Sequence, residues 1–90
     1  MLVAMPKQKS PQPTAREVFA RNLRRARRLQ DLTQEALALE AGMPRAYVSR
    51  VERGTINVSI DNADALSQAV GVPLRDLVDP AKFAGLDDPS

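Results

Sequence analysis

The stretch "TQEALALEAGMPRAYVSRVERG", residues 33–54, carries the pattern of two short helices joined by a tight turn. Thr33 suits a helix N-cap, and Gly42 suits the left-handed residue that ends a helix. Proline is favoured in a first turn, so a second helix is predicted to begin at Pro44 and to end before Gly54. The segment therefore predicts helices over residues 34–41 and 44–53.

The apolar residues of this segment are in phase with a helix–turn–helix motif. Ala38 is small enough for two helices to cross closely, and Gly42 supplies a backbone conformation that penalises a Cβ atom. Further apolar side chains that can meet between the helices are Leu37, Ala41, Met43, Val48 and Val51. Together they predict a helix–turn–helix motif over residues 34–53.

The amino-acid composition limits the kinds of catalysis and metal binding that the chain can support. Its 90 residues are enough for one small domain. It has no cysteine and no histidine, which excludes thiol nucleophiles and most zinc chemistry. No constellation of base, nucleophile or metal ligand is visible, so we expect neither an enzyme nor a bound cofactor or metal. No apolar run approaches the ~20 residues that cross a membrane, and we expect a cytoplasmic protein with no membrane partner.

Charge is unevenly distributed along the chain. Residues 1–53 hold eleven Lys and Arg against five Asp and Glu, a balance of +6. Residues 54–90 hold two against six, a balance of −4, and the whole chain carries +2. A basic half favours a polyanionic partner, which would repel the acidic end.

The remaining segments predict three more helices. Thr14 and Glu17 form a capping box for a helix over residues 15–30. Its apolar arc is formed by Ala15, Val18, Phe19, Leu23, Ala26 and Leu29. Ser59 caps a helix over residues 60–70, and the face of that helix is formed by Ile60, Ala63, Leu66, Ser67 and Val70. Pro73 opens a last short helix that ends at Val78.

These elements define one domain between two tails. Residues 1–13 hold three prolines and no periodicity, which indicates a disordered tail. Residues 79–90 form a second, loosely held tail. No strand pattern occurs, so the sequence predicts an all-α, compact five-helix domain over residues 14–78.

The helix predicted over residues 44–53 has a polar face without an acid. Arg45, Ala46, Ser49, Arg50 and Arg53 fall within an arc of about 140°, at about 100° per residue. A face that is merely solvated would more often mix Glu with Lys. Arginine can donate to guanine O6 and N7, and small side chains allow close contact with thymine methyl groups. We therefore predict base reading by Arg45, Ala46, Ser49 and Arg50, and DNA-backbone contact by Arg53.

Residues 33–54, followed by "NVSIDNADALSQAVGVPLRDLV" at 57–78, resemble the Cro/repressor-type (xenobiotic response element) helix-turn-helix family of bacterial and phage regulators. The resemblance implies a Cro/repressor-like fold and a sequence-specific, double-stranded DNA-binding transcriptional regulator, a repressor in sign. It also implies a homodimer on a pseudo-palindromic operator, associated with the nucleoid when bound. Two departures from the family pattern are Asp31, where glycine is usual, and Pro44, where a hydroxyl cap is usual.

The resemblance also implies an internal ion pair. Glu52 lies at the border of the buried side of its helix, where an unpaired carboxylate would be costly. Arg27 occupies the matching border of the helix over residues 15–30. We predict a structural Arg27–Glu52 pair that fixes the recognition helix against that helix.

Further DNA-backbone contacts are predicted around this core. Gln34 would meet a phosphate from the first turn of its helix, and the resemblance implies that it also braces the recognition helix, although it could be an ordinary first-turn residue. Asn57 and Ser59 resemble the family's second phosphate clamp, and Ser59 is equally an N-cap. Tyr47 either touches phosphate or sugar or packs on the domain. Two more candidates for backbone contact are Arg24 and Arg28.

The partners of the domain stay open between two interpretations. The first is the homodimeric regulator, whose expected dimer surface is Val72, Leu74, Leu77, Val78, Phe83 and Leu86. The alternative is an antitoxin or controller-type module whose main role is to bind a protein partner, with DNA binding for autoregulation.

Overall fold

The computed structural model describes residues 13–83. Within this part of the chain there are five helices and no strand: α1 (Ala15–Leu29), α2 (Gln34–Ala41), α3 (Arg45–Glu52), α4 (Ile60–Val70) and α5 (Leu74–Leu77). The predicted all-α, five-helix class is therefore confirmed, with helix ends that differ by at most a residue. Pro44 and Pro73 are N-caps rather than first-turn residues. The predicted N-terminal tail at residues 1–12, the predicted C-terminal tail at residues 84–90 and the dimer contact expected of Leu86 lie outside the described residues.

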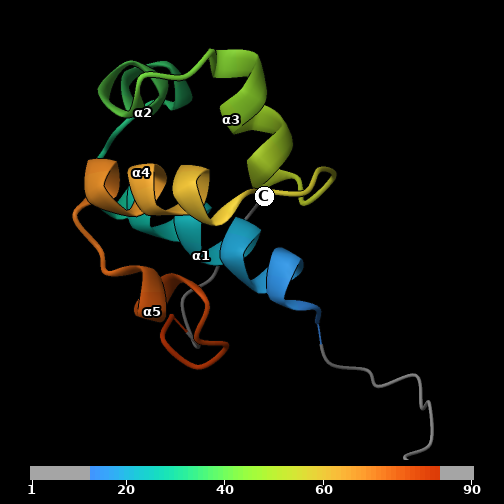
Figure 1. Ribbon diagram of the computed structural model, residues 1–90. Helices are drawn as coiled ribbons and strands as arrows, with labels where there is room; N and C mark the ends of the chain where they lie inside the picture. The colour runs from blue at the N-terminus through green and yellow to red at the C-terminus, as the bar shows by residue number, and fades with distance from the viewer. Residues whose placement is uncertain (1–12, 84–90) are drawn as a thin grey trace, which may run out of the picture.

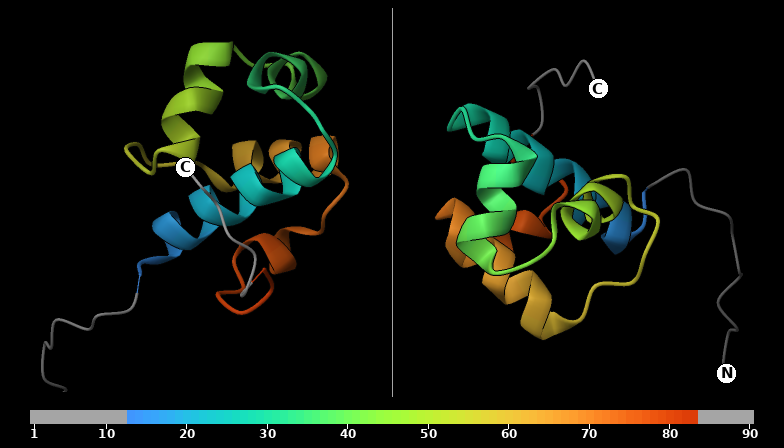
Figure 2. Two further views of the ribbon diagram at one scale, coloured as in Figure 1. Left: turned by 180° about the vertical axis from the view of Figure 1, so that it is seen from behind. Right: turned by 90° about the horizontal axis from the view of Figure 1, so that it is seen from above.

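The helices form a central layer with elements on both sides. Helices α1 and α4 lie across the middle, with α2 and α3 on one side and α5 on the other (Figures 1 and 2). Helices α2 and α3 therefore lie together at the end of the molecule opposite α5, and α3 lies at the edge of that end.

Local chemistry fixes where the helices begin and end. Thr14 and Glu17 make the predicted capping box, and Thr33 and Ser59 accept the backbone N–H of Ala36 and Asn62. Gly42 ends α2 in the left-handed conformation at φ 73°.

Asp31 occupies the same left-handed region. Its φ is 57°, the one positive φ at a non-glycine residue in the described part of the chain. This conformation is easiest for glycine, because a Cβ crowds the backbone there. The local geometry gives a physical reason for the glycine that the family resemblance associates with this position.

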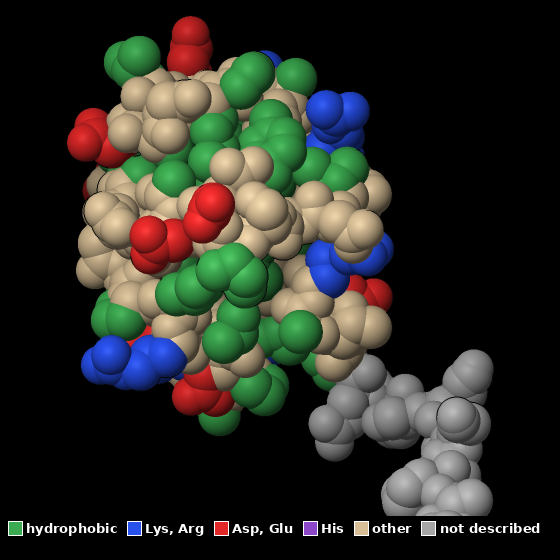
Figure 3. Space-filling view, in the orientation of Figure 1, with side chains coloured by type: hydrophobic (Ala, Val, Ile, Leu, Met, Phe, Trp, Pro, Cys, Tyr) green, Lys and Arg blue, Asp and Glu red, His purple; other side chains and the backbone are tan. Residues whose placement is uncertain are grey.

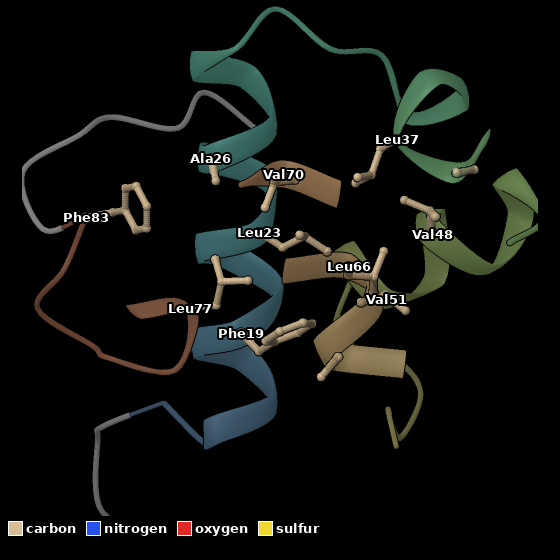
Figure 4. Packing of buried hydrophobic residues seen from close by; sticks show 12 residues of the cluster. Phe19, Leu23, Ala26, Leu37, Val48, Val51, Leu66, Val70, Leu77 and Phe83 are labelled. Atoms are coloured by element: carbon tan, nitrogen blue, oxygen red, sulfur yellow. The ribbon is translucent and has the colours of Figure 1, made fainter. Parts of the chain in front are cut away.

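A single aliphatic core joins all five helices. Leu23, Leu37, Leu66 and Leu77 are completely buried, and Val51 is 1% exposed. Figure 4 shows side chains of α1, α3 and α4 pointing toward one another in this core.

Three apolar residues predicted to face the core, among them Ala15, are exposed instead. Leu29 is 63% exposed and Ile60 is 74% exposed. Each stands at a helix end, where the apolar arc runs beyond the elements that cover it. A periodic pattern gives the direction of a side chain, but the presence of a neighbour opposite it depends on the packing of other elements.

Polar side chains of α1 and of its C-cap residue, Gln30, donate to carbonyl groups at the ends of three other helices. Arg24 Nη1 donates to the Glu52 carbonyl of α3 at 3.0 Å, and Gln30 Nε2 donates to the Val70 carbonyl of α4. Asn22 is fully buried, and its Nδ2 lies 3.3 Å and 3.2 Å from the carbonyls of Asp76 and Leu77 in α5. The last carbonyls of a helix have no partner within it, so α1 stabilises three helix ends at once.

The packed unit continues beyond the predicted boundary at Val78. Asn22 Nδ2 also donates to the Asp79 carbonyl at 2.9 Å, and Arg25 Nη1 donates to the Phe83 carbonyl at 3.2 Å. Phe83 is 8% exposed and belongs to the core. Residues 79–83 are therefore part of the packed domain rather than a loose tail, because α1 supplies donors to their carbonyls.

Candidate nucleic-acid interface

Helices α2 and α3 and the turn between them have the geometry of a helix–turn–helix motif. After Gly42, the Met43 N–H donates back to the Ala38 carbonyl at 2.9 Å, which closes the turn. Ala38 is 3% exposed where the helices cross. The apolar side chains that join the pair to the core include Leu37, Val48 and Val51.

The outer face of α3 presents cations and small side chains. Arg45, Ala46, Arg50 and Arg53 are exposed, and Ser49 is half-buried. Arg53 Nη1 donates to Ser49 Oγ at 2.6 Å, which ties these two side chains together along the helix. Lys and Arg side chains lie along the edge of the molecule beside α3 (Figure 3).

The acid of α3 is turned inward and neutralised. Arg27 Nε lies 2.7 Å from Glu52 Oε2, and Arg27 Nη2 lies 2.9 Å from Glu52 Oε1. Glu52 is 2% exposed and Arg27 is 8% exposed. The expected Arg27–Glu52 pair is thus present, in a bidentate and buried form that fixes both position and direction of α3 against α1.

Gln34 joins the same cluster from the first turn of α2. Its Nε2 donates to Glu52 Oε1 at 3.0 Å. The Glu52 carboxylate therefore receives donors from both α1 and α2, and it ties the recognition helix to each. This contact matches the bracing that was expected of Gln34, and its phosphate contact stays a proposal.

Tyr47 packs on the domain. It is half-buried against the core, and its hydroxyl accepts a hydrogen bond from Asn62 Nδ2 at 2.9 Å. This contact links α3 to α4. Its hydroxyl keeps a donor, so an additional contact with DNA stays a proposal.

The segment between α3 and α4 follows a fixed path past α1. Gly54 has a φ of 72°, and the N–H and hydroxyl of Thr55 both donate to the Arg50 carbonyl at 3.2 Å. Ile56 and Val58 pack against the core, whereas Asn57 and Ser59 are exposed. The alternation presents the two predicted clamp residues to the outside.

Arg16 was missed by the sequence analysis. Its Nη2 donates to Asn57 Oδ1 and so joins the first turn of α1 to the exposed loop. The residues are 41 positions apart, and no short motif signals such a pair.

Helix α1 carries two arginines that were predicted to contact the DNA backbone, Arg24 and Arg28. Arg24 is half-buried and donates to the Glu52 carbonyl, whereas Arg28 is exposed. Contact of either residue with the DNA backbone stays a proposal.

Some residues of the expected dimer surface are buried in the domain and others are exposed. Leu77 is fully buried and Phe83 is 8% exposed, so both close the core of their own domain. Val72 and Leu74 pack partly against that core, and Val78 is 43% exposed. Ile60, which was assigned to the core, is instead exposed beside Val78 on a groove of about 390 Å³.

Two other properties of the described residues bear on function. None of their helices is long and apolar enough to span a membrane. No group of three or more acidic, histidine or cysteine side chains in residues 13–83 could hold a metal ion.

Comparisons with known proteins assign this arrangement to a class. The family model described as Helix-turn-helix matches residues 23–77. The chain therefore belongs to the helix-turn-helix family, and it is a DNA-binding transcriptional regulator of the Cro/repressor type.

Individual relatives make the likeness more specific. Control protein C.BamHI of Bacillus amyloliquefaciens is 49% identical over 49 residues, which cover 54% of this chain and 60% of that protein. The restriction-modification controller protein C.AhdI of Aeromonas hydrophila has a similar structure, with a TM-score of 0.66 and 40% identity over 69% of this chain and 94% of its own. A hypothetical transcription factor of Neisseria meningitidis has a TM-score of 0.75 and 33% identity over 88% of this chain and 91% of its own. The chain spans less than two thirds of the length of C.BamHI.

Proposed function

We propose that this protein is a controller-type regulator that binds a two-fold symmetric operator as a homodimer, with α3 of each copy in the major groove. The observation that carries the proposal is the division of α3 into two chemical faces. Arg45, Ala46, Arg50 and Arg53 are exposed, whereas Glu52 is buried in its pair with Arg27. The face left for a ligand holds arginines and the small side chains of Ala46 and Ser49 and no acid, which suits the acceptor-rich edge of guanine and the phosphates beside it.

Two groups of residues have different roles in this proposal. Arg45, Ala46, Ser49 and Arg50 meet base edges, because they lie along the outward side of α3. Residues at the flanks hold the DNA backbone: Gln34, Tyr47, Arg53, Asn57, Ser59, Arg24 and Arg28. Such contacts fix register and supply salt-dependent affinity, whereas base contacts supply specificity.

We place the surface that joins the two copies at the exposed groove. Ile60 projects beside a hollow lined by Phe19, Val58, Ala63 and Leu74. A two-fold interface brings the same patch of each copy together, so a projection next to a hollow can pack reciprocally. A single domain of this size buries little DNA surface, and a dimer joins two half-sites about one helical turn apart.

The relatives indicate a biological setting. Two of them are named as control or controller proteins, and one is linked to restriction–modification. We infer a regulator in a bacterial cytoplasm that acts at the nucleoid. A dimer bound over a promoter would exclude polymerase, which makes repression the expected sign. The comparison proteins are regulators, and we propose that this chain likewise has no enzymatic activity.

Selection from random double-stranded DNA with the full chain tests the proposal. We expect enrichment of a guanine-containing, two-fold symmetric site. The control is Arg75→Ala, which removes an equal charge from an exposed position on α5 and should leave the enriched site unchanged. Absence of any enrichment at low salt would overturn the proposal, and a protein that co-purifies in equal amount would favour the partner-binding alternative.

The dimer surface has its own test. Ile60→Asp should convert a dimer to a monomer in sedimentation velocity at micromolar concentration, and Leu39→Asp is the matched control on α2, where the side chain is 83% exposed. A wild-type chain that sediments as a monomer in the presence of its selected DNA would remove the homodimer from the proposal.

A further inference from the structure

The Arg16–Asn57 contact has no role in the core and none in the buried ion-pair cluster. Both side chains are exposed, and they connect the first turn of α1 to the loop that follows the recognition helix. In Figure 1 this loop lies at the same edge of the molecule as the end of α3 and the start of α1. The contact therefore borders the surface proposed to face DNA.

Hydrogen bonds and packing fix the backbone on both sides of Asn57, so only its side chain can rotate. Thr55 is fixed to the Arg50 carbonyl, and Ser59 caps α4 through the Asn62 N–H at 3.0 Å. Ile56 and Val58 are packed into the domain. Only rotation of the Asn57 side chain then decides which of its two polar atoms faces outward.

The amide group of asparagine has an accepting end and a donating end. Its oxygen accepts hydrogen bonds and its nitrogen donates two. A DNA phosphate only accepts, so it needs the nitrogen and is repelled by the oxygen. The guanidinium of Arg16 takes the Asn57 oxygen, since a guanidinium can only donate. The nitrogen is thereby directed away from Arg16.

The place of Arg16 in its own helix supports a function beyond folding. Arg16 is in the first turn of α1, next to Glu17 of the capping box. A cation near a helix N-terminus opposes the helix dipole at a cost of about 0.3–1 kcal/mol. Residues that break a local rule in this way are expected at functional sites.

We propose that Arg16 is a positioning residue for DNA binding: it fixes the Asn57 amide so that Nδ2 donates to a backbone phosphate. This inference rests on the proposed function, because it requires that the loop after α3 faces DNA. It deepens that function by adding the first turn of α1 to the phosphate clamp at Asn57, and it makes the Asn57 contact conditional on Arg16.

The experiment is a double-mutant cycle with the full chain on its selected operator. Affinity is measured by fluorescence anisotropy for the wild type, Arg16→Ala, Arg16→Gln, Asn57→Ala and the Arg16→Ala/Asn57→Ala pair. We expect Arg16→Ala and Asn57→Ala each to weaken binding about tenfold, the size of one hydrogen bond to a charged group. The double variant should be no weaker than either single one, because both changes remove the same contact.

The Arg16→Gln variant separates the orientation of the Asn57 amide from the charge at position 16. Its amide N–H₂ can still donate to the Asn57 oxygen, so Arg16→Gln should recover most of the affinity that Arg16→Ala removes. If Arg16→Gln is as weak as Arg16→Ala and the double variant is additive, Arg16 acts as a charge alone and the inference fails. Equal affinity of Arg16→Ala and the wild type would also overturn it.

Controls separate this inference from folding, dimerisation and the proposed function itself. Melting temperature and sedimentation of each variant should match the wild type, a necessary check because Arg16 and Asn57 both line the groove assigned to the dimer. Arg75→Ala reports the effect of removing a distant charge. If Arg45→Ala weakens binding while Arg16→Ala does not, only the role of Arg16 is refuted; if neither does, the proposed function fails.

Discussion

Helices α1 and α3 both carry several arginines. The two helices differ in whether groups of the same domain accept hydrogen bonds from those arginines. On α1, Arg24, Arg25 and Arg27 donate to carbonyls or to Glu52 within the domain. On α3, Arg45 and Arg50 are exposed and donate to no side chain or carbonyl among the described residues. Arginine content therefore does not identify a DNA-binding helix. The discriminating feature is whether helix ends and carboxylates of the same domain already occupy the guanidinium groups.

The largest effect expected from this comparison concerns the pair that joins the two helices. Glu52→Ala should lower the free energy of unfolding by about 3–5 kcal/mol, because it leaves the Arg27 charge buried without a partner. Thermal unfolding followed by circular dichroism should show a fall in Tm of more than about 10 °C. Replacement of both residues, Arg27→Met with Glu52→Leu, is the control and should be far milder. An unchanged Tm for Glu52→Ala would show that the pair does not stabilise the domain.

Substitutions on the outer face of α3 should weaken DNA discrimination and leave the stability of the domain unchanged. Arg45→Ala or Arg50→Ala should cost about 1–3 kcal/mol of discrimination between the selected operator and a site with the paired guanine replaced. Melting temperature should stay within about 1 °C of the wild type, since these side chains are exposed. Competition binding with the two DNA sites measures the effect. An equal fall in affinity for both sites would identify the residue as a phosphate contact instead.

A third pair of variants compares one arginine from each helix. Arg24→Ala should lower stability by about 1 kcal/mol, because the Glu52 carbonyl then has no donor from α1, and should also reduce the salt slope if its proposed phosphate contact forms. Arg53→Ala should leave stability unchanged and reduce the log–log salt slope by about 0.9 for each phosphate that is no longer neutralised. Binding titrations at several salt concentrations provide the slopes. An unchanged slope for Arg24→Ala would remove Arg24 from the proposed backbone contacts and leave it a purely internal role.

The smallest expected effect lies in the turn between α1 and α2. Asp31→Gly should raise the free energy of unfolding by a few tenths to about 1 kcal/mol, because the residue has a φ of 57°. Chemical denaturation should detect the gain, with DNA affinity unaltered. Asp31→Ala is the matched comparison and should not stabilise the domain, since it keeps the Cβ.

The fold was predictable because its signals are local. Caps at Thr14, Thr33 and Ser59 and the left-handed Gly42 locate the helices without knowledge of the tertiary structure. The polar face of α3 likewise follows from the period of a helix. Exposure at Leu29 and Ile60 and burial of Asn22 did not follow, because each depends on which element lies opposite a helix end.

The sequence by itself determined five helices, the helix–turn–helix spacing and a recognition face without an acid, since backbone hydrogen bonding and helical periodicity set all three. Tertiary structure decided the use of each polar side chain. It placed Asn22 and Arg24 at the ends of α5 and α3, extended the packed domain to Phe83, and brought Arg16 to Asn57 across 41 positions. Such contacts depend on how the helices pack in three dimensions, and no local pattern in the chain encodes them.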